Sequence, residues 1–393
     1  MVNRTLDLAC MLKNGHSAFL FGPRGVGKTL LSKEFIKSNQ PSFTIDLLSY
    51  DLYTRYISQP SLFRKEIEAA IKPGQLLTVF IDEIQKLPLL LDEIHSLIES
   101  HKGQIQFLLT GSSARKLKRG GANLLAGRAW TLRLHPLTHQ EVNLDLNKAL
   151  EIGTLPAIYL EESGVHRTLK AYVETYLKEE IMQEALVRKV DSYIRFMDIA
   201  GQMNGEPLNF TSIARDCGVS IKTVQEFVSI LVDTLLAFRI EGWTYSIRKQ
   251  LRQSPKIYFF DCGVLNAVRG ELGMKVKPNS FIYGKRFETF VILELIRLND
   301  YLESGYKFHY WRTNTGLEVD LILSRRFTEP SIAIEIKSRN APTEADVHAL
   351  RSFKAENPKA ELFCLCTTQN KYRLGAVLVC PWQEGIREIL GTF

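Results

Sequence analysis

The apolar positions in the first third of the 393-residue chain predict a parallel β-sheet covered by helices. Residues 17–21, 76–81 and 104–110 are short runs dominated by apolar side chains. Such runs are too apolar for surface strands and are typical of strands that helices cover on both faces. A further run at 129–134 predicts the last strand of this unit. We therefore predict an α/β domain over residues 1–142.

The pattern becomes helical between residues 143 and 270. Residues 208–231 predict two helices joined by a turn at Gly218, and Ser220 is a suitable N-cap for the second helix. Four apolar side chains of that helix fall on one face, namely Val224, Phe227, Val228 and Leu231. This arrangement predicts a helix-turn-helix.

A strand at 235–240 and the stretch 244–256 predict a wing beside these helices, which makes the middle segment a helical, winged-helix domain. The basic residues of the stretch are Arg248, Lys249, Arg252 and Lys256. Lys222 and Gln225, on the second helix, are candidates to contact DNA. Modules of this kind also serve as protein-packing scaffolds, and the sequence leaves both roles open.

Two strands with charged residues among apolar ones are predicted at 317–323 and 331–337. Successive side chains along a strand point to opposite faces, so Glu335 and Lys337 share one face. If the strands pair with Asp320 beside Glu335, two carboxylates can hold a divalent metal through oxygen ligands. The lysine would then steady a water or the scissile phosphate.

Glu288, on a predicted helix at 286–298, is a candidate to add a ligand or to orient the base of this site. The alternative is that Glu335 and Lys337 form a simple salt bridge on an edge strand. Charges inside two otherwise apolar strands are costly without a partner, which favours a metal-dependent phosphodiesterase site. We assign this site to a third, α/β segment at 271–393.

A glycine-rich segment after the first strand carries the most specific chemistry. The letters GPRGVGKT at 22–29 lie between a strand and a helical pattern, which is the setting of a phosphate-binding loop. Lys28 is expected to reach the β- and γ-phosphates of a nucleoside triphosphate, and Thr29 to ligate Mg²⁺. The expected nucleotide contacts along this segment are Gly22, Pro23, Arg24, Gly25, Val26, Gly27, Lys28, Thr29 and Leu30.

Two adjacent acids, Asp82 and Glu83, follow the strand at 76–81. Ligands of parallel sheets bind at the carboxyl ends of the strands, so these acids should lie near Lys28. Asp82 suits the Mg²⁺ shell, through water, and Glu83 is the candidate that orients or deprotonates the attacking water. Hydrolysis, and not binding alone, is therefore expected.

Small hydroxyl residues follow the strand at 104–110. Thr110 or Ser112 is placed to sense the γ-phosphate, and it is equally open that Ser112 or Ser113 caps a helix. These residues belong to the same sheet edge as the two acids.

A basic segment follows at 114–128. One option is that Arg128 or Arg119 reaches the nucleotide of a neighbouring subunit as an arginine finger. Solvated loop residues remain the default for Arg115 and Lys116.

Composition narrows the class of protein. The chain is 45% apolar, long enough for two or three domains, and carries a net charge of +7, which permits a polyanionic partner. Its six cysteines show no CxxC pair, so we expect buried thiols and neither disulfides nor zinc ligands. No apolar run approaches a membrane span and no signal peptide is recognisable, so we expect a cytoplasmic protein without a membrane partner.

These motifs resemble those of a prokaryotic AAA-type ATPase. The matching segments of the first domain are 21–29, 82–88, 110–113 and 127–128. Residues 258–263 and 283–288 look like the subfamily whose carboxyl half ends in a PD-(D/E)XK-like fold, so the resemblance covers nearly the whole chain. It implies an ASCE-type P-loop domain, and it gives Asp320, Glu335 and Lys337 the nuclease motif, with Glu288 as the helix acid.

The leading functional expectation is ATP hydrolysis, with Mg²⁺, coupled to the binding or metal-dependent cleavage of branched or single-stranded DNA. Mn²⁺ is a second candidate metal at the nuclease-like site, and a homo-oligomer would be needed for any shared arginine finger. The alternative is an ATP-driven switch or remodeller in defence or signalling whose carboxyl half is a non-catalytic docking module.

Overall fold

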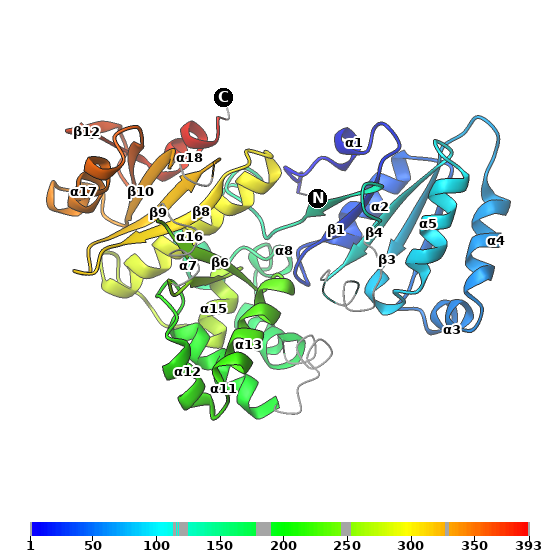
Figure 1. Cartoon of the computed structure of the whole chain (residues 1–393), viewed down its shortest axis with the longest axis horizontal. Coiled ribbons are helices and arrows are strands. Elements are labelled where there is room, and N and C mark those ends of the chain that lie inside the picture. The colour runs from blue at the N-terminus through cyan, green and yellow to red at the C-terminus, as the bar shows by residue number, and fades with distance from the viewer. Residues whose placement is uncertain are drawn as a thin grey trace.

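The computed structural model describes residues 2–112, 115, 117, 125–177, 190–244, 253–326 and 330–391 (Figure 1). These residues form two β-sheets, one near each end of the chain, with a group of helices between them in sequence. Several residues considered in the sequence analysis lie outside the described ranges: Ser113, Lys116, Arg119, Arg248, Lys249 and Arg252.

The first sheet has five parallel strands in the order β2-β3-β4-β1-β5. The strands are β1 Ser17–Phe21, β2 Ser42–Asp46, β3 Leu77–Asp82, β4 Ile105–Gly111 and β5 Ala129–Arg133. Every residue of β1, β3 and β4 is buried, as the apolar runs predict. The edge strand β2 is only partly buried, so it has no comparable apolar run in the sequence.

Helices connect the strands of this sheet and cover it. They are α2 Lys28–Ser38, α3 Tyr50–Ser58, α4 Pro60–Ala70 and α5 Leu90–Ser100, preceded by the short α1 Leu8–Met11. A parallel sheet needs such crossovers because consecutive strands run in the same direction. The carboxyl ends of β1, β3 and β4 therefore meet at one edge of the sheet.

The middle of the chain is helical, as predicted. Its elements are α7 Leu146–Ile152, α8 Pro156–Tyr159, α9 Val165–Ala171, a π-helical turn Tyr172–Leu177, α11 Val190–Gln202, α12 Phe210–Cys217 and α13 Ile221–Asp233. Gly218 joins α12 to α13 with a φ of 66°, and the Ser220 hydroxyl accepts a hydrogen bond from the Thr223 amide at 3.2 Å. The predicted helix-turn-helix elements are thus present.

The second sheet has eight strands in the order β12-β13-β11-β10-β9-β8-β6-β7. Its strands are β6 Ala237–Gly242, β7 Lys256–Phe259, β8 Lys307–Arg312, β9 Glu318–Ser324, β10 Ile332–Lys337, β11 Glu361–Cys366, β12 Tyr372–Leu374 and β13 Val377–Pro381. β6 pairs antiparallel with β7 and parallel with β8. The sheet therefore crosses position 270, where the sequence analysis divides the middle and third segments.

The helix α16 Phe281–Tyr301 connects the two halves of the molecule. It is buried along most of its length and runs beside the second sheet toward the first (Figure 1). One continuous hydrophobic core includes Leu20 and Leu134 of the first unit and Phe287 and Leu298 of α16. The remaining helices of this region are α15 Cys262–Val268, α17 His348–Glu356 and α18 Trp382–Leu390. Within the described residues, no helix is both long and apolar enough to cross a membrane.

Candidate nucleotide site and carboxylate site

The glycine-rich segment forms a tight loop between β1 and α2. Gly25 and Gly27 have φ values of 86° and 96°, a region that side chains with a Cβ rarely adopt. A Cβ on Gly22 would lie 2.3 Å from the carbonyl oxygen of Leu134, the residue that follows β5. The loop thus needs glycine for its backbone conformation and for its close packing. It delivers the amide groups at the start of α2 to the strand edge, where they favour an anion.

Lys28 and Thr29 begin α2 beside this loop. Lys28 is 6% exposed, and its ammonium donates hydrogen bonds to the carbonyl oxygens of Gly22 at 2.8 Å and Pro23 at 3.1 Å. The Thr29 hydroxyl donates to the Asp82 carboxylate at 2.8 Å. The next residue, Leu30, has a side chain that is 53% exposed.

Asp82 and Glu83 lie where β3 ends, next to the end of β4. The Thr110 hydroxyl donates to Asp82 and accepts a hydrogen bond from the Glu83 amide at 3.2 Å. Glu83 has a φ of 58°, in the left-handed region, which is uncommon for a residue other than glycine. Such backbone strain is of order 1–3 kcal/mol and tends to occur at functional sites. The two acids and Thr110 thus converge near Thr29.

Three contact residues at this edge were not predicted from the sequence. Gln85 donates to the carboxylate of Glu83 and, at 3.3 Å, to the hydroxyl of Ser112. The Tyr172 hydroxyl donates to the carbonyl of Arg24 at 3.0 Å, and Arg4 donates to the carbonyl of Val26 at 2.8 Å. Arg4 and Tyr172 come from distant parts of the chain, so no local pattern indicates them. Gln85 is only two residues from Glu83, and this closeness in sequence was the available signal.

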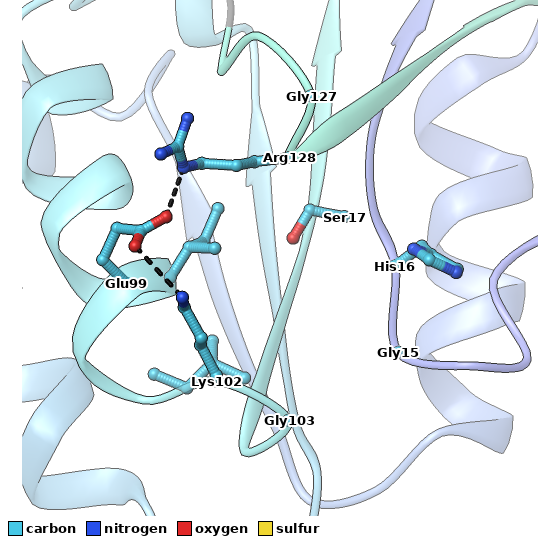
Figure 2. Close-up of a pocket in the computed structure, with 10 residues that line it drawn as sticks. Gly15, His16, Ser17, Glu99, Lys102, Gly103, Gly127 and Arg128 are labelled. Carbon is cyan, nitrogen blue, oxygen red and sulfur yellow. Dashed lines mark hydrogen bonds and ion pairs between the residues drawn. The ribbon is translucent and has the colours of Figure 1, made fainter.

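Arg128 lies at the amino ends of the strands of the first sheet, opposite the ends that carry the phosphate loop and the two acids. It directly precedes β5, and Ser17, at the start of β1, lines the same pocket of about 610 Å³ (Figure 2). Arg128 pairs with Glu99 of α5, and Lys102 pairs with the same carboxylate at 3.3 Å. Because the phosphate loop follows the carboxyl end of β1, Arg128 cannot contact a nucleotide bound to its own chain. Its role as an arginine finger toward the nucleotide of a neighbouring subunit remains a prediction.

The exposed face of α13 is partly covered by the first unit. Lys222 and Gln225 are exposed near the start of the helix. Farther along, Arg115 donates to the Ser229 hydroxyl at 3.2 Å and pairs with Asp233. The face considered for DNA contact is thus accessible at its start and engaged by the first unit at its end.

A second group of charged side chains, which we call the carboxylate site, lies on β9 and β10. It consists of Asp320, Glu335 and Lys337. These strands are antiparallel, and the pairing of Ile334 with Leu321 makes Glu335 the next residue opposite Asp320. The Ile336 amide donates to the Asp320 carboxylate at 2.8 Å, and Lys337 pairs with Glu335. The sequence-based expectation that Asp320, Glu335 and Lys337 lie together therefore agrees with the geometry.

Glu335 is 5% exposed, and its Oε2 atom has no hydrogen-bond partner within the described ranges. Burial, followed by the nearby Asp320 carboxylate, raises the pKa of Glu335 well above its usual range. Burial opposes the charged form of Lys337, but the carboxylates of Asp320 and Glu335 outweigh it and raise the pKa of that lysine. The site therefore brings two carboxyl groups and one ammonium group together where water is largely excluded.

Glu288, on α16, faces the same group of residues. It is 9% exposed, accepts a hydrogen bond from the Tyr258 hydroxyl at 3.2 Å, and lies 3.5 Å from the Lys285 ammonium. Burial, and then Asp320, raise the pKa of Glu288 to about 7. In the part of the chain that the structure describes, no three Asp, Glu, His or Cys side chains form a metal-ligand cluster.

Family models match three consecutive parts of the chain. Residues 14–143 match the model described as an AAA domain. Residues 143–275 and 283–384 match two different models, each described as a domain of unknown function.

Whole-chain relatives are uncharacterized. A protein of Mycobacterium tuberculosis is 26% identical over 368 residues, which cover 92% of this chain and 78% of the relative. A protein of Haemophilus influenzae is 23% identical, over 85% of this chain and 86% of the relative. The Holliday junction branch migration complex subunit RuvB of Staphylococcus saprophyticus is 29% identical over 56% of this chain and 55% of that protein.

Among solved structures, C. elegans PCH-2 aligns with 16% identity and a TM-score of 0.24, over 46% of this chain and 44% of that chain.

The family match and the loop geometry agree on the first unit. Residues 14–143 are an AAA-type P-loop domain, a class that binds and hydrolyses ATP.

Proposed function

We propose that this chain is an ATP hydrolase that couples nucleotide turnover to the binding and metal-dependent cleavage of DNA. The observation that carries the ATPase part is the convergence of Lys28, Thr29, Asp82 and Glu83 at one sheet edge. The observation that carries the nuclease part is the opposition of Asp320 and Glu335 with Lys337 beside them.

At the phosphate loop, the oxygens of Thr29 and Asp82 are already 2.8 Å apart, and hard oxygen ligands suit Mg²⁺. These two residues would hold the ion, Asp82 through water, and the ion would offset the charge on the phosphates. Lys28 would bind the β- and γ-phosphates, and Glu83 would orient the attacking water. The Thr110 hydroxyl bonds to both the Asp82 carboxylate and the Glu83 amide and so helps to hold the two acids in place.

At the carboxylate site, Asp320 and Glu335 would hold Mg²⁺ or Mn²⁺, and the unpartnered Oε2 of Glu335 supports this assignment. Such an ion would supply charge stabilisation for the cleaved phosphodiester. Lys337 would then steady the scissile phosphate or a water. Glu288, which does not complete a three-ligand cluster with the other two acids among the described residues, would orient the base. Arg312, the last residue of β8, and Arg339, two residues after β10, are half exposed and are cations suited to an anionic backbone.

DNA is the proposed polymer for two reasons. The accessible start of α13 presents Lys222 and Gln225, and the matched relative from Staphylococcus is, by its name, a subunit of a Holliday junction complex. We infer branched or single-stranded DNA as the substrate class.

The test is incubation of the protein with end-labelled branched and single-stranded DNA, ATP and Mg²⁺ or Mn²⁺. We expect cleavage that is lost in Asp320→Ala and Lys337→Ala but retained in Glu384→Ala, a control acid of α18 that is half exposed and pairs with Lys371. Identical traces from the wild type and the first two variants reject the nuclease assignment.

A second candidate function is an ATP-driven switch whose carboxyl half is a non-catalytic docking module. It is favoured by the ion pairs at the carboxylate site, where Lys337 already pairs with Glu335 and Lys285 with Glu288. Under this alternative, Asp320→Ala leaves every DNA trace unchanged, while Lys28→Ala abolishes nucleotide-dependent behaviour.

A further inference from the structure

Gln85 forms a polar link between the tips of two strands in the nucleotide site. It belongs to a one-turn helix, Ile84–Lys86, that directly follows Glu83. Its side-chain nitrogen donates to the Glu83 carboxylate and, at 3.3 Å, to the Ser112 hydroxyl. The amide thus connects the acid after β3 to the residue after β4.

The burial of this amide is not explained by packing alone. Gln85 is 6% exposed, and its Oε1 atom lacks a hydrogen-bond partner among the described residues. An unsatisfied buried polar atom lowers the stability of the fold, so an apolar side chain of the same shape would serve stability better. The buried Gln106 amide of β4 carries the same cost, so what distinguishes Gln85 is the hydrogen bond that it donates to the Glu83 carboxylate.

Gly111 provides the space that the amide needs. A Cβ on Gly111, the last residue of β4, would lie 2.6 Å from Oε1 of Gln85 and 3.3 Å from a ring carbon of Phe21. Any larger residue there would displace the amide. The position of the Gln85 amide therefore depends on a glycine at residue 111.

We propose that Gln85 is a positioning residue for ATP hydrolysis, which holds the Glu83 carboxylate in the orientation needed to act on the attacking water. A free glutamate side chain samples several rotamers, and fixing it in one of them costs conformational entropy. The amide fixes it in advance and ties it to Ser112. This inference rests on the proposed role of Glu83 in hydrolysis.

The first test is Gln85→Met, which keeps the shape and removes the donor. We expect kcat to fall roughly 10-fold to 100-fold while the dissociation constant of ATP stays within about two-fold, because a misplaced base affects turnover and not binding. The matched control is Gln106→Met. Gln106 is a buried amide of β4 that donates to the Thr78 hydroxyl at 2.8 Å, and it too has an unpartnered Oε1 within the part of the chain described. It lies toward the opposite edge of the sheet, so kcat should not change.

The second test is a double-mutant cycle with Glu83→Gln. If Gln85 acts through Glu83, adding Gln85→Met to Glu83→Gln causes no further loss of kcat. Independent effects that multiply, or full kcat in Gln85→Met, overturn the inference while leaving the proposed hydrolysis intact. Full turnover in Glu83→Gln rejects the proposed role of Glu83 and this inference with it.

Gly111→Ala tests the same inference if Gln85→Met does not fold. The added methyl should push the amide away and give the same signature, a lower kcat with unchanged ATP affinity. Wild-type kcat in a folded Gly111→Ala variant contradicts the proposal.

Discussion

Arg4 and Tyr301 are hydrogen-bonded at 3.1 Å although 297 residues separate them. The same guanidinium donates to the carbonyl of Val26 in the phosphate loop at 2.8 Å. Tyr301 ends α16, the helix that carries Glu288 nearer its start. One arginine therefore connects the phosphate loop to the helix that contributes an acid to the carboxylate site.

Tyr301→Phe should lower the free energy of unfolding by about 1–3 kcal/mol, because the hydroxyl is the acceptor for two donors. These donors are the Arg4 guanidinium and the His135 amide, the latter at 2.8 Å. Urea denaturation measures the loss. Tyr50→Phe is the control. Tyr50 is 78% exposed, so loss of its hydroxyl should leave the free energy of unfolding unchanged. Equal stability of the wild type and Tyr301→Phe would show that the hydroxyl bonds contribute nothing net.

Lys28→Ala should lose most of the affinity for ATP, because the loop then lacks its buried cation. Titration calorimetry with ATP and Mg²⁺ measures this. Lys33→Ala, a change one turn farther along α2, is the control and should bind normally. Normal affinity in Lys28→Ala would contradict the assignment of the loop.

Glu83→Gln should bind ATP with wild-type affinity and release phosphate at least about 100-fold more slowly, since the amide cannot accept a proton from the attacking water. A phosphate-release assay beside the calorimetric titration separates turnover from binding. Unchanged turnover rejects the role of this acid.

Arg128→Ala should reduce ATP turnover only in an oligomer. Arg128 lies near Ser17, at the start of β1 (Figure 2), whereas the phosphate loop of its own chain follows the end of that strand. Mixing Arg128→Ala with Glu83→Gln subunits should restore part of the activity if subunits share sites. Sedimentation that shows a fully active monomer at all ATP concentrations rules out this role.

Mg²⁺ without nucleotide should stabilise the protein through the carboxylate site. At a concentration 100-fold above the dissociation constant, a bound ion raises the free energy of unfolding by about 2.7 kcal/mol. The gain should persist in Lys28→Ala and disappear in Asp320→Asn, which removes a carboxylate charge opposite Glu335. Thermal unfolding with and without Mg²⁺ makes the comparison. An equal gain in Asp320→Asn would mean that the ion binds elsewhere.

Local sequence patterns were sufficient to predict which residues of the two candidate sites lie close together. The strand, glycine loop and helix around Lys28 follow from contiguous residues, and the register that sets Asp320 opposite Glu335 follows from the alternation of side chains along β9 and β10. Ser220 was recognisable as an N-cap because its hydroxyl acts on the next turn of the same helix. In each case, the physical cause lies within a few residues of its effect.

The rest depends on contacts between distant segments. No local pattern shows that Arg4 reaches Val26, or that β6 pairs with β8 so that one sheet joins the middle and third segments. The edge strand β2 escaped prediction because one of its faces is solvated. Such features are set by tertiary packing, which overrides or supplements local preference.

His309 should make the protein less stable in mild acid. It is 6% exposed beside Trp243, and neither of its ring nitrogens has a hydrogen-bond partner among the residues described. Burial, and then the charge of Lys307, lower its pKa to about 4.

Between pH 6.5 and 4 the unfolded chain therefore binds a proton at His309 that the folded chain does not, so the free energy of unfolding falls as the pH falls. From pH 7.5 to pH 5 this loss amounts to about 2 kcal/mol. His309→Leu should lose that much less stability over the same interval in urea denaturation, with His16→Leu as a control. If both variants follow the wild-type pH dependence, the folded protein accommodates the charged imidazole, and His309 must gain solvent or a partner when it is protonated.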